Sequence, residues 1–548
     1  MNPTATDSRP VDREIVGKSS TASGQTLAVT SSPEDPQYKM NHKYRGYAII
    51  INNERFADMP ARHGSEKDRD VIADALKSLR FKVRVFDDPD KKKLFKVLKK
   101  YAEKDHTDND CVVLVVMTHG EDGTLYAADG TYEVEQLWNP FAGSACPTLV
   151  GKPKLVFLQM ARNKPVVAAG QERRLSDAVD SREKSAIQQY SLPVMADQLV
   201  VFSTHDSLCS SLCPLEGSTF VHSLASTLKK YGQTVDLLTL LATVSAAVAN
   251  YPSDPDQKKS VPYTMSTLTK CVYFRNQKAE SSAPEPWDLK TLSPPKYDMN
   301  RGGLVIILNQ MKFDDAELYR EGSDKDRDAI EKSFFELGFR VRPHDNPSQD
   351  KVFEILKGVS EENHTDNDCL VVVVLTHGEK GTLMAADTQA PHRPPYRVAR
   401  LWERFVDSAC PTLRGKPKIF LIQACRGTQT DPGVLVEAPV TRSVEEKNEV
   451  YATSTAPDLL IAYSTFEGHY SYRSGEDGSW FIQSLVKTLR EHGSGKDLSN
   501  LLTCVARDVA TSNTSYMPGD PAKHNKKQMP VTVSTLTKAV YFCPDARS

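Results

Sequence analysis

The feature of the sequence that most constrains the fold is a long internal repeat. Four short motifs occur twice, and the spacing between their two occurrences grows from 258 to 268 residues along the chain. Solenoid repeats are roughly 20–50 residues long, so a period of this length excludes a solenoid and predicts two tandem copies of a whole domain. Each copy is large enough to bury its own core. The motifs are KDRD (67–70 and 325–328), HTDNDC (106–111 and 364–369), PTLVGKPK or PTLRGKPK (147–154 and 411–418) and STLTKCVYF or STLTKAVYF (266–274 and 534–542).

We divide the chain into four segments where its composition changes. Residues 1–40 are rich in Ser, Thr and Pro and lack hydrophobic periodicity, so we expect them to be disordered. Residues 41–276 and 299–548 are the two copies. Residues 277–298 lie between the copies and contain four prolines, which predicts an exposed linker.

Apolar runs of strand length recur in the same order in both copies and alternate with helical patterns. The runs 111–117 and 370–375 are nearly continuous in Val and Leu, which is typical of a strand covered on both faces. Strands that alternate with helices predict an α/β domain with a mainly parallel sheet. The expected strands are 47–52 and 304–309, 111–117 and 370–375, 155–159 and 419–423, 199–203 and 459–464, and a final pair at 270–274 and 538–542; the expected helices are 71–79 and 329–337.

Composition excludes several functional classes. Hydrophobic residues make up 39% of the chain and charged residues 26%, as in an ordinary globular protein. The net charge of −2 gives no reason to expect nucleic acid or another polyanion as a partner. One lysine-rich stretch, residues 91–100, carries apolar residues at helical spacing, so we interpret it as an amphipathic helix with a solvated cationic face.

Hydropathy and cysteine spacing predict a cytoplasmic protein. No apolar run reaches the roughly 18 residues that a membrane span needs, and the first residues lack the hydrophobic core of a secretory signal. Ten cysteines without clustered spacing argue against a disulfide scaffold and favour reduced thiols. Cys209 and Cys213 have no second Cys or His pair at zinc-site spacing, so we expect no metal and no other cofactor.

Two residues of the second copy follow buried strands and have the chemistry of a nucleophilic site. Ligands bind beyond the carboxyl ends of parallel strands, where His377 and Cys425 lie. A thiol nucleophile needs a base that takes and returns its proton. The pentapeptide QACRG at 423–427, with His377 located 48 residues upstream, matches the signature of caspases. The chain resembles the caspase family over residues 41–543, twice in succession.

The resemblance implies a site for cleaving proteins after aspartate. By position, Cys425 matches the nucleophile, His377 the proton carrier, and the backbone N–H groups of Gly378 and Cys425 the oxyanion hole. Two guanidiniums beside an amide suit a carboxylate, because Arg forms bidentate charged hydrogen bonds. Related paracaspases and metacaspases cut after Arg or Lys and need an acidic pocket, whereas this pocket is basic. The residues that match the substrate pocket are Arg320, Gln423, Ser471, Tyr472, Arg473 and Trp480.

The resemblance also implies a fold, a subtype and a biological setting. Each copy should be a mostly parallel central sheet of about six strands flanked by helices. The short N-terminal segment without an adaptor domain is similar to the prodomain of executioner caspases, which are apoptotic zymogens. A caspase zymogen is cut in an exposed loop, and the first copy offers Asp180, followed by Ser181, in such a stretch.

The first copy has lost the residues on which this chemistry depends. Ala161 stands at the nucleophile position, and Leu212 stands opposite Arg473. The sequence therefore predicts a pseudoenzyme in the first copy. The retained site residues are His119, Arg62 and Gln159, and two further replacements are Ser211 opposite Tyr472 and Thr219 opposite Trp480.

Two questions stay open at the level of sequence. Caspase domains pair side by side through their last strand, so the two copies are expected to pair within one chain, with a homodimer as the alternative. A non-catalytic function also remains possible on the sequence, in which the chain binds caspases or their substrates as a decoy or scaffold and Cys425 is silent.

Overall fold

The computed structural model describes most of both copies. It covers residues 8–10, 32, 34–121, 123–161, 191–203, 212–213, 217–251, 261–275, 295–388, 392–435 and 457–542. The expected cleavage site at Asp180, together with Cys209 and Ser211, lies outside these residues.

Each copy is built on six strands of one central sheet. The strands of the first copy are β2 (Tyr47–Asn52), β3 (Lys82–Asp87), β4 (Val112–Glu121), β7 (Lys154–Ala161), β9 (Gln198–Phe202) and β12 (Tyr263–Ser266). Those of the second are β13 (Gly303–Asn309), β14 (Arg340–Asp345), β15 (Cys369–Leu375), β19 (Lys418–Gln423), β21 (Leu459–Tyr463) and β25 (Val531–Ser534). Only β12 and β25 run antiparallel to their neighbours, so the prediction of a mostly parallel sheet is confirmed.

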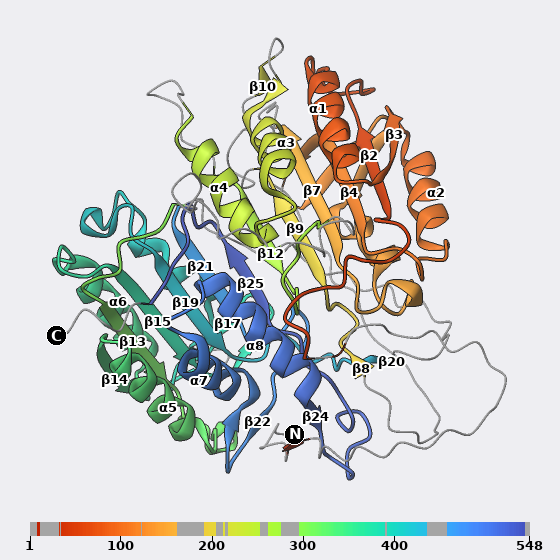
Figure 1. The fold of residues 1–548 in the computed structure, drawn as a ribbon. Coiled ribbons are helices and arrows are strands. Elements are labelled where there is room, and N and C mark those ends of the chain that lie inside the picture. Colours follow the sequence, from red (N-terminus) through yellow and green to blue (C-terminus); the bar gives the residue numbers. More distant parts are fainter. Residues whose placement is uncertain are drawn as a thin grey trace.

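The two six-stranded halves join edge to edge into one sheet. Its order is β14-β13-β15-β19-β21-β25-β12-β9-β7-β4-β2-β3, and β25 pairs antiparallel with β12 at the centre (Figure 1). The edge that each copy would otherwise expose is covered by the other copy.

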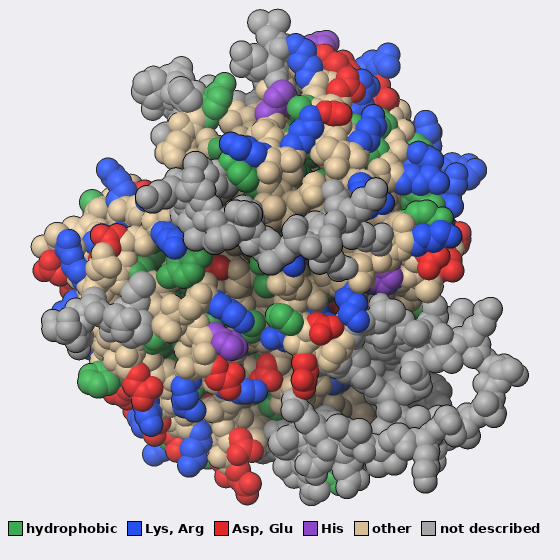
Figure 2. Space-filling view, in the orientation of Figure 1, with side chains coloured by type: hydrophobic (Ala, Val, Ile, Leu, Met, Phe, Trp, Pro, Cys, Tyr) green, Lys and Arg blue, Asp and Glu red, His purple; other side chains and the backbone are tan. Residues whose placement is uncertain are grey.

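Helices cover both faces of the sheet in each copy. One face carries α1 (Ser65–Ser78), α3 (Thr219–Tyr231) and α4 (Leu237–Ala249) in the first copy and α5 (Ser323–Glu336), α7 (Trp480–His492) and α8 (Leu498–Ser512) in the second. The opposite face carries α2 (Lys91–Ala102) and α6 (Gln349–Glu361). Helix α2 buries Leu94, Val97 and Leu98, which confirms the amphipathic pattern expected at 91–100. Figure 2 shows Lys and Arg side chains gathered over α2, at the right edge of the molecule.

Short strands and 3-10 helices complete the two copies. In the first copy they are β5 (Thr124–Ala127), β6 (Gly130–Glu133), β8 (Ser191–Leu192), β10 (Leu212–Cys213), β11 (Gly217–Ser218), η1 (Val134–Leu137), η2 (Asn139–Phe141) and η3 (Pro147–Leu149). In the second they are β16 (Gly378–Glu379), β17 (Thr382–Leu383), β18 (Tyr396–Arg397), β20 (Val434–Leu435), β22 (Arg473–Ser474), β23 (Gly478–Ser479), β24 (Asn513–Ser515), η5 (Ala316–Leu318), η6 (Val398–Leu401), η7 (Glu403–Phe405) and η8 (Pro411–Leu413). Near the N-terminus, β1 (Ser8–Pro10) pairs antiparallel with β24.

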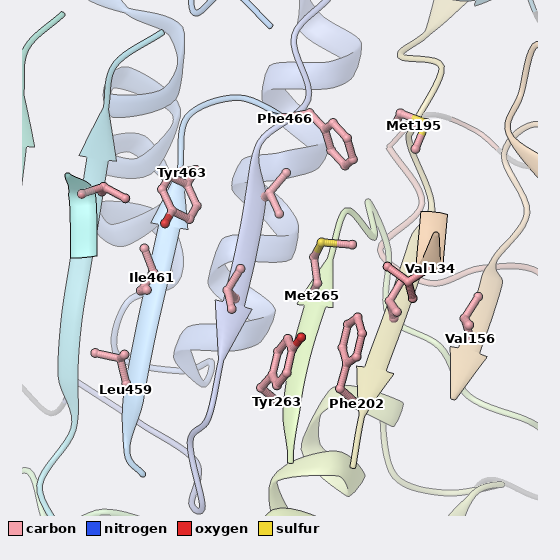
Figure 3. Packing of buried hydrophobic residues seen from close by; sticks show 14 of the residues in the cluster. Val134, Val156, Met195, Phe202, Tyr263, Met265, Leu459, Ile461, Tyr463 and Phe466 are labelled. Carbon is pink, nitrogen blue, oxygen red and sulfur yellow. The ribbon is translucent and has the colours of Figure 1, made fainter. Parts of the chain in front are cut away.

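The hydrophobic core continues across the junction between the copies. One cluster of buried side chains, on the face covered by α2 and α6, contains residues of both halves. Figure 3 shows its centre, where Tyr263 of β12 and Phe202 of β9 point to the same side of the sheet as Ile461 and Tyr463 of β21. The Tyr263 and Phe202 rings stack with centroids 4.4 Å apart. Burial of this apolar surface stabilises the junction in addition to the backbone hydrogen bonds.

The expected final strands are wrong in position. Residues 270–274 and 538–542 each contain one isolated β-bridge, at Cys271 and Ala539, and belong to no strand; the strands that join the copies are the preceding segments β12 and β25. Val272 and Phe274 instead pack into the core on the helical face that carries α1, α3 and α4. The apolar run was therefore a real core segment, and only its assignment to the sheet failed.

Packed structure also begins before the expected domain boundaries. Tyr38, in the segment expected to be disordered, is buried, and its hydroxyl donates to Asp197 Oδ1 at 2.6 Å. Tyr297, at the end of the expected linker, makes the equivalent bond to Asp458 Oδ1 at 2.5 Å. Within the described parts of the chain, no helix has both the length and the apolar character that a membrane crossing requires.

Candidate active site

The sheet brings His377 and Cys425 to the same edge. Strands β15 and β19 are parallel neighbours in which Leu375 pairs with Gln423, so His377 and Cys425 each lie two residues beyond the paired ends. The N–H of Thr376 also donates to the carbonyl of Gln423 at 3.0 Å. Gly378 lies so close to the nucleophile candidate that a Cβ there would be 2.8 Å from the Cys425 carbonyl oxygen, which explains the glycine.

A backbone carbonyl orients the imidazole of His377. Nε2 lies 2.9 Å from the carbonyl oxygen of Leu318 in η5. A carbonyl only accepts, so Nε2 carries the proton and Nδ1 of the neutral ring is the atom that can take one. Burial, and then the positive charge of Arg320, lower the pKa of His377 to about 3. The ring is therefore neutral at physiological pH.

The thiol of Cys425 is bound to the backbone of Ser471. The Ser471 N–H donates to Sγ at 3.4 Å, and Sγ lies 3.7 Å from the Ser471 carbonyl oxygen. Burial raises the pKa of the thiol, while the Ser471 N–H and the guanidiniums of Arg473 and Arg320 act in the opposite direction. The resting pair is a protonated thiol beside a neutral imidazole.

The three residues of the expected aspartate pocket surround this pair. Arg320 is buried and donates from Nη1 to the Gln310 carbonyl at 2.8 Å, while its Nε and Nη2 have no partner among the described residues. Gln423 donates from Nε2 to Ser471 Oγ at 2.9 Å. Arg473 on β22 is partly exposed and donates from Nε to the Glu321 carbonyl at 2.7 Å. Burial lowers the pKa of both guanidiniums, and the charge of Arg473 lowers that of Arg320 further.

Tyr472 and Trp480 lie behind the pocket. Both are buried, and their rings stack with centroids 4.7 Å apart. The Tyr472 N–H donates to Gln528 Oε1 at 2.6 Å. These two aromatic residues pack against each other, and their expected role in the substrate pocket stays a prediction.

A buried carboxylate that the sequence analysis missed supports the two arginines. Asp326 Oδ1 accepts from the Ser479 N–H and from Gln483 Nε2, each at 2.9 Å. Ser479 pairs with Arg473 in the β22–β23 hairpin, so Asp326 holds the strand that carries this arginine. Its charge also raises the pKa of both Arg320 and Arg473. The available signal was the repeated KDRD motif, which contains Asp326 and its counterpart Asp68.

The first copy supports the loop that follows Cys425. Strand β8 of the first copy pairs antiparallel with β20 of the second. The N–H of Val194 in the first copy donates to Asp431 Oδ2 at 3.0 Å, and the Lys527 N–H donates to the Asp431 carbonyl at 2.8 Å. No feature of the sequence alone indicated this contact, because β8 and β20 are each two residues long.

The first copy keeps the scaffold of the site and has Ala161 at the position of Cys425. His119 pairs directly with Ala161 across β4 and β7. His119 Nε2 lies 2.9 Å from the Pro60 carbonyl, and Arg62 Nη1 donates to the Asn53 carbonyl at 2.9 Å, as His377 and Arg320 do with their own carbonyls. Leu212 pairs with Ser218 as Arg473 pairs with Ser479, which places Leu212 at the arginine position. Gln159 is buried, and Thr219 begins α3 as Trp480 begins α7.

Comparison with known proteins identifies the family. The sequence model of the caspase domain family matches residues 45–273 and 302–541, which together are well over half of the chain. The chain belongs to the caspase family. Each copy separately matches a caspase domain, so the tandem arrangement and the caspase-type α/β fold are confirmed.

Individual caspases match about one copy each. Caspase-1 of Drosophila melanogaster is 39% identical over 253 residues, covering 45% of this chain and 76% of the relative. Caspase-7 of Gallus gallus is 36% identical over 302 residues, covering 53% and 96%. The crystal structure of caspase-1 from Spodoptera frugiperda has 38% identity and a TM-score of 0.40, and covers 48% of this chain and 97% of its own. The family model and the two sequence relatives support a caspase-type cysteine protease.

Proposed function

We propose that the chain is an aspartate-specific cysteine endopeptidase with one working site, in the second copy. Cys425 is the nucleophile, His377 the general base and acid, and Arg320, Gln423 and Arg473 the pocket for the substrate aspartate. The observation that carries the proposal is the chain of contacts from Gln423 through Ser471 to the Cys425 thiol, directly beside two guanidiniums. Nucleophile and carboxylate pocket are thereby fixed relative to each other.

The proposed reaction follows from the protonation states. Nδ1 of His377 takes the proton of Cys425 as Sγ attacks the carbonyl carbon of the substrate aspartate. The N–H groups of Gly378 and Cys425 receive the oxyanion. When the C–N bond breaks, the imidazolium of His377 returns its proton to the leaving amine. Water then hydrolyses the thioester, with His377 again as base.

A carboxylate substrate side chain suits this pocket electrostatically. Two buried or partly buried guanidiniums lower the pKa of His377 and repel each other in the free protein. A substrate aspartate neutralises part of this charge and pairs with Arg320 Nε and Nη2, which have no partner in the described structure. A neutral residue at this position leaves the cations desolvated, so selectivity for Asp is expected to be steep.

The first copy is proposed to be an inactive partner that orders the active loop. It has Ala161 at the nucleophile position, and its β8 and Val194 contact the loop of Asp431 six residues after Cys425. Pairing within the chain is favoured because the linker holds the copies at an effective concentration on the order of millimolar. We further propose processing at Asp180 and an apoptotic output, and domain boundaries that include the buried Tyr38 and Tyr297.

Turnover of a fluorogenic peptide ending in Asp tests the proposal. Wild-type protein should cleave it, Cys425→Ala should not, and a peptide ending in Asn should be cleaved far more slowly. Activity per molecule of the full chain should be independent of dilution, whereas residues 295–548 alone, which keep the buried Tyr297, should lose activity at nanomolar concentration. Activity that survives Cys425→Ala would contradict the assignment, and equal activity of the isolated second copy would contradict the role of the first.

A further inference from the structure

Helix α2 of the inactive copy carries an unusual concentration of positive charge. Six of its lysines are exposed, and they define the α2 lysine face: Lys91, Lys92, Lys93, Lys96, Lys99 and Lys100. Among the described residues, only Lys99 has an ion pair, to Glu103 at 3.7 Å. Figure 2 shows Lys and Arg side chains close together at the right edge of the molecule, where Figure 1 places α2.

The equivalent helix of the active copy has balanced charges. In α6, Lys351 pairs with Glu354 at 2.8 Å and Lys357 with Glu361 at 3.8 Å. Asp350 and Glu354 of α6 occupy the positions of Lys92 and Lys96 in α2, 258 residues earlier. The two helices pack on the same face of the sheet and begin with a side-chain N-cap, so packing does not explain the difference.

Helix stability does not explain the lysines either. Three of them occupy the first turn, where the helix dipole disfavours positive charge, and that turn contains no acidic residue. Lys92 and Lys96 are four residues apart, as are Lys96 and Lys100, and like charges at this spacing destabilise a helix. A group of charges that lowers the stability of its own helix is expected where those charges serve a function.

We infer that the α2 lysine face is a docking site for an acidic tract in the protein substrate, outside the active site. Lys92, Lys96 and Lys100 recur about every 6 Å along the helix. Alternate side chains of an extended acidic segment recur about every 6.6 Å, which matches this spacing. The inference rests on the proposed endopeptidase function for the identity of the partner.

The surroundings of the lysines favour a polypeptide over other anions. Single-stranded nucleic acid is bound by exposed aromatic side chains, but Tyr101 is buried and Phe95 is partly buried against Tyr132, with ring centroids 5.7 Å apart. Insertion into a membrane needs an exposed apolar face, but Leu94, Val97 and Leu98 face the core. The remaining interaction is electrostatic, and the family acts on proteins.

Binding and turnover measured on the full chain test the inference separately. The probe for binding is a fluorescein-labelled peptide of ten glutamates, with the Cys425→Ala chain, at low ionic strength. Lys92→Glu with Lys96→Glu should weaken binding about tenfold, since two exposed attractions become repulsions. The matched control, Lys351→Glu with Lys357→Glu in α6, makes the same change in net charge and should leave binding unchanged. Salt at about 0.5 M should abolish the binding.

In turnover measurements, the α2 lysine face should act by lowering the KM of substrates that carry an acidic tract. A carrier protein with an Asp cleavage site should have an about tenfold lower KM when a glutamate tract is added, and Lys92→Glu with Lys96→Glu should remove this advantage at unchanged kcat. A short peptide should be cleaved equally by both proteins. An equal effect of the α6 control, or tighter binding of duplex DNA or phosphatidylserine vesicles than of the glutamate peptide, would overturn the inference. Glutamate binding without any turnover would instead refute the proposed protease function.

Discussion

The two copies share nearly the same scaffold around the candidate site, and they differ at the position of Cys425, where the first copy has Ala161. The imidazole contacts are equivalent in the two copies, because Nε2 of His377 and of His119 each lie 2.9 Å from a backbone carbonyl oxygen. The buried arginines also correspond, since Arg320 and Arg62 each donate from Nη1 to a backbone carbonyl. The buried carboxylate is also retained, because Asp68 Oδ1 accepts from the Ser218 N–H at 2.7 Å as Asp326 does from Ser479. These contacts are therefore common to both copies, although the residues at positions 161 and 425 differ.

The comparison teaches that site residues have two kinds of role. Arg62 is buried, like Arg320, and donates to a backbone carbonyl, so its loss would leave a buried acceptor unpaired. Ala161 and Leu212 stand where the second copy has Cys425 and Arg473, whose contacts with the Ser471 N–H and the Glu321 carbonyl are less buried than those of the first arginine. The fully buried arginine is thus the same in both copies, whereas two less buried positions differ.

The largest expected effect comes from making the second copy resemble the first at the nucleophile. Cys425→Ala should reduce kcat/KM for an Asp peptide by about ten-thousandfold or more, since no other thiol replaces the attacking atom. The reverse change, Ala161→Cys in the Cys425→Ala background, should restore no activity because Leu212 still occupies the arginine position. Measurable turnover by that double variant would show that the first copy lacks only its nucleophile.

The next effect comes from the pocket. Arg473→Leu copies Leu212, removes a charged contact worth about 3–4 kcal/mol, and should lower kcat/KM for Asp substrates by about a hundredfold to a thousandfold. The melting temperature should change little, because the first copy folds with leucine there. Arg473→Lys is the matched control and should retain more activity than the leucine variant, as it keeps the charge. Unchanged selectivity for Asp over Asn in Arg473→Leu would refute the pocket assignment.

A third effect concerns two equivalent carboxylates that face each other where the copies meet. Asp236 and Asp497 cap α4 and α8, and burial followed by the charge of Asp497 raises the pKa of Asp236 to about 7. A carboxyl with a raised folded pKa binds a proton on folding, so its stabilising contribution is present below about pH 4 and is lost as the pH rises to about 7. The loss amounts to about 2–4 kcal/mol.

Thermal unfolding at pH 5 and pH 8 checks this linkage. Wild type should lose stability between pH 5 and pH 8 as Asp236 ionises, whereas the amide of Asp236→Asn cannot ionise. The melting temperature of the variant minus that of wild type should therefore be higher at pH 8 than at pH 5. Asp366→Asn, at a side chain that is 92% exposed, is the control and should show no such rise. A difference between Asp236→Asn and wild type that is constant with pH would contradict the raised pKa.

The smallest effect concerns the contact between the copies at the active loop. Asp431→Ala leaves the N–H groups of Val194 and Gly433 without their acceptor and should lower kcat about tenfold, since each unpaired donor costs about 1–3 kcal/mol. Asp407→Ala serves as a control because the ion pair of Asp407 is with Lys418 of its own copy, and no bond from it to a described residue of the first copy is seen. Activity of Asp431→Ala equal to wild type would mean that the first copy does not order this loop.

The sequence predicted the fold well where the signal was local and buried. The expected strand at 47–52 matches β2 without error, and the strand expected at 419–423 differs from β19 by one residue. The final strands failed because an extended core segment and a strand have the same apolar pattern, and only pairing distinguishes them. The segments that do pair, β12 and β25, are four residues long and contain polar side chains.

The candidate site was predicted where a motif marked it. The sequence predicted which residues would surround Cys425, and the structure brings His377, Gly378, Gln423 and Ser471 together at one sheet edge. It could not predict that Asp326 supports the arginines or that Val194 contacts Asp431. These contacts are defined by hydrogen bonds between segments 153 and 237 residues apart, and a hydrogen bond leaves no periodic pattern in the sequence.

Because β12 pairs with β25 inside one chain, mutations can change the two sides of this interface independently. In a symmetric homodimer, every substitution at the interface occurs twice, and two identical sites can influence each other. Here each side of the junction is encoded separately, as Cys271 illustrates: it donates to Asn500 Oδ1 at 3.0 Å, whereas alanine stands at the corresponding position 539. A molecule with one working site has no partner site to communicate with, so saturation curves should be hyperbolic, and a covalent inhibitor should be consumed at one equivalent per chain.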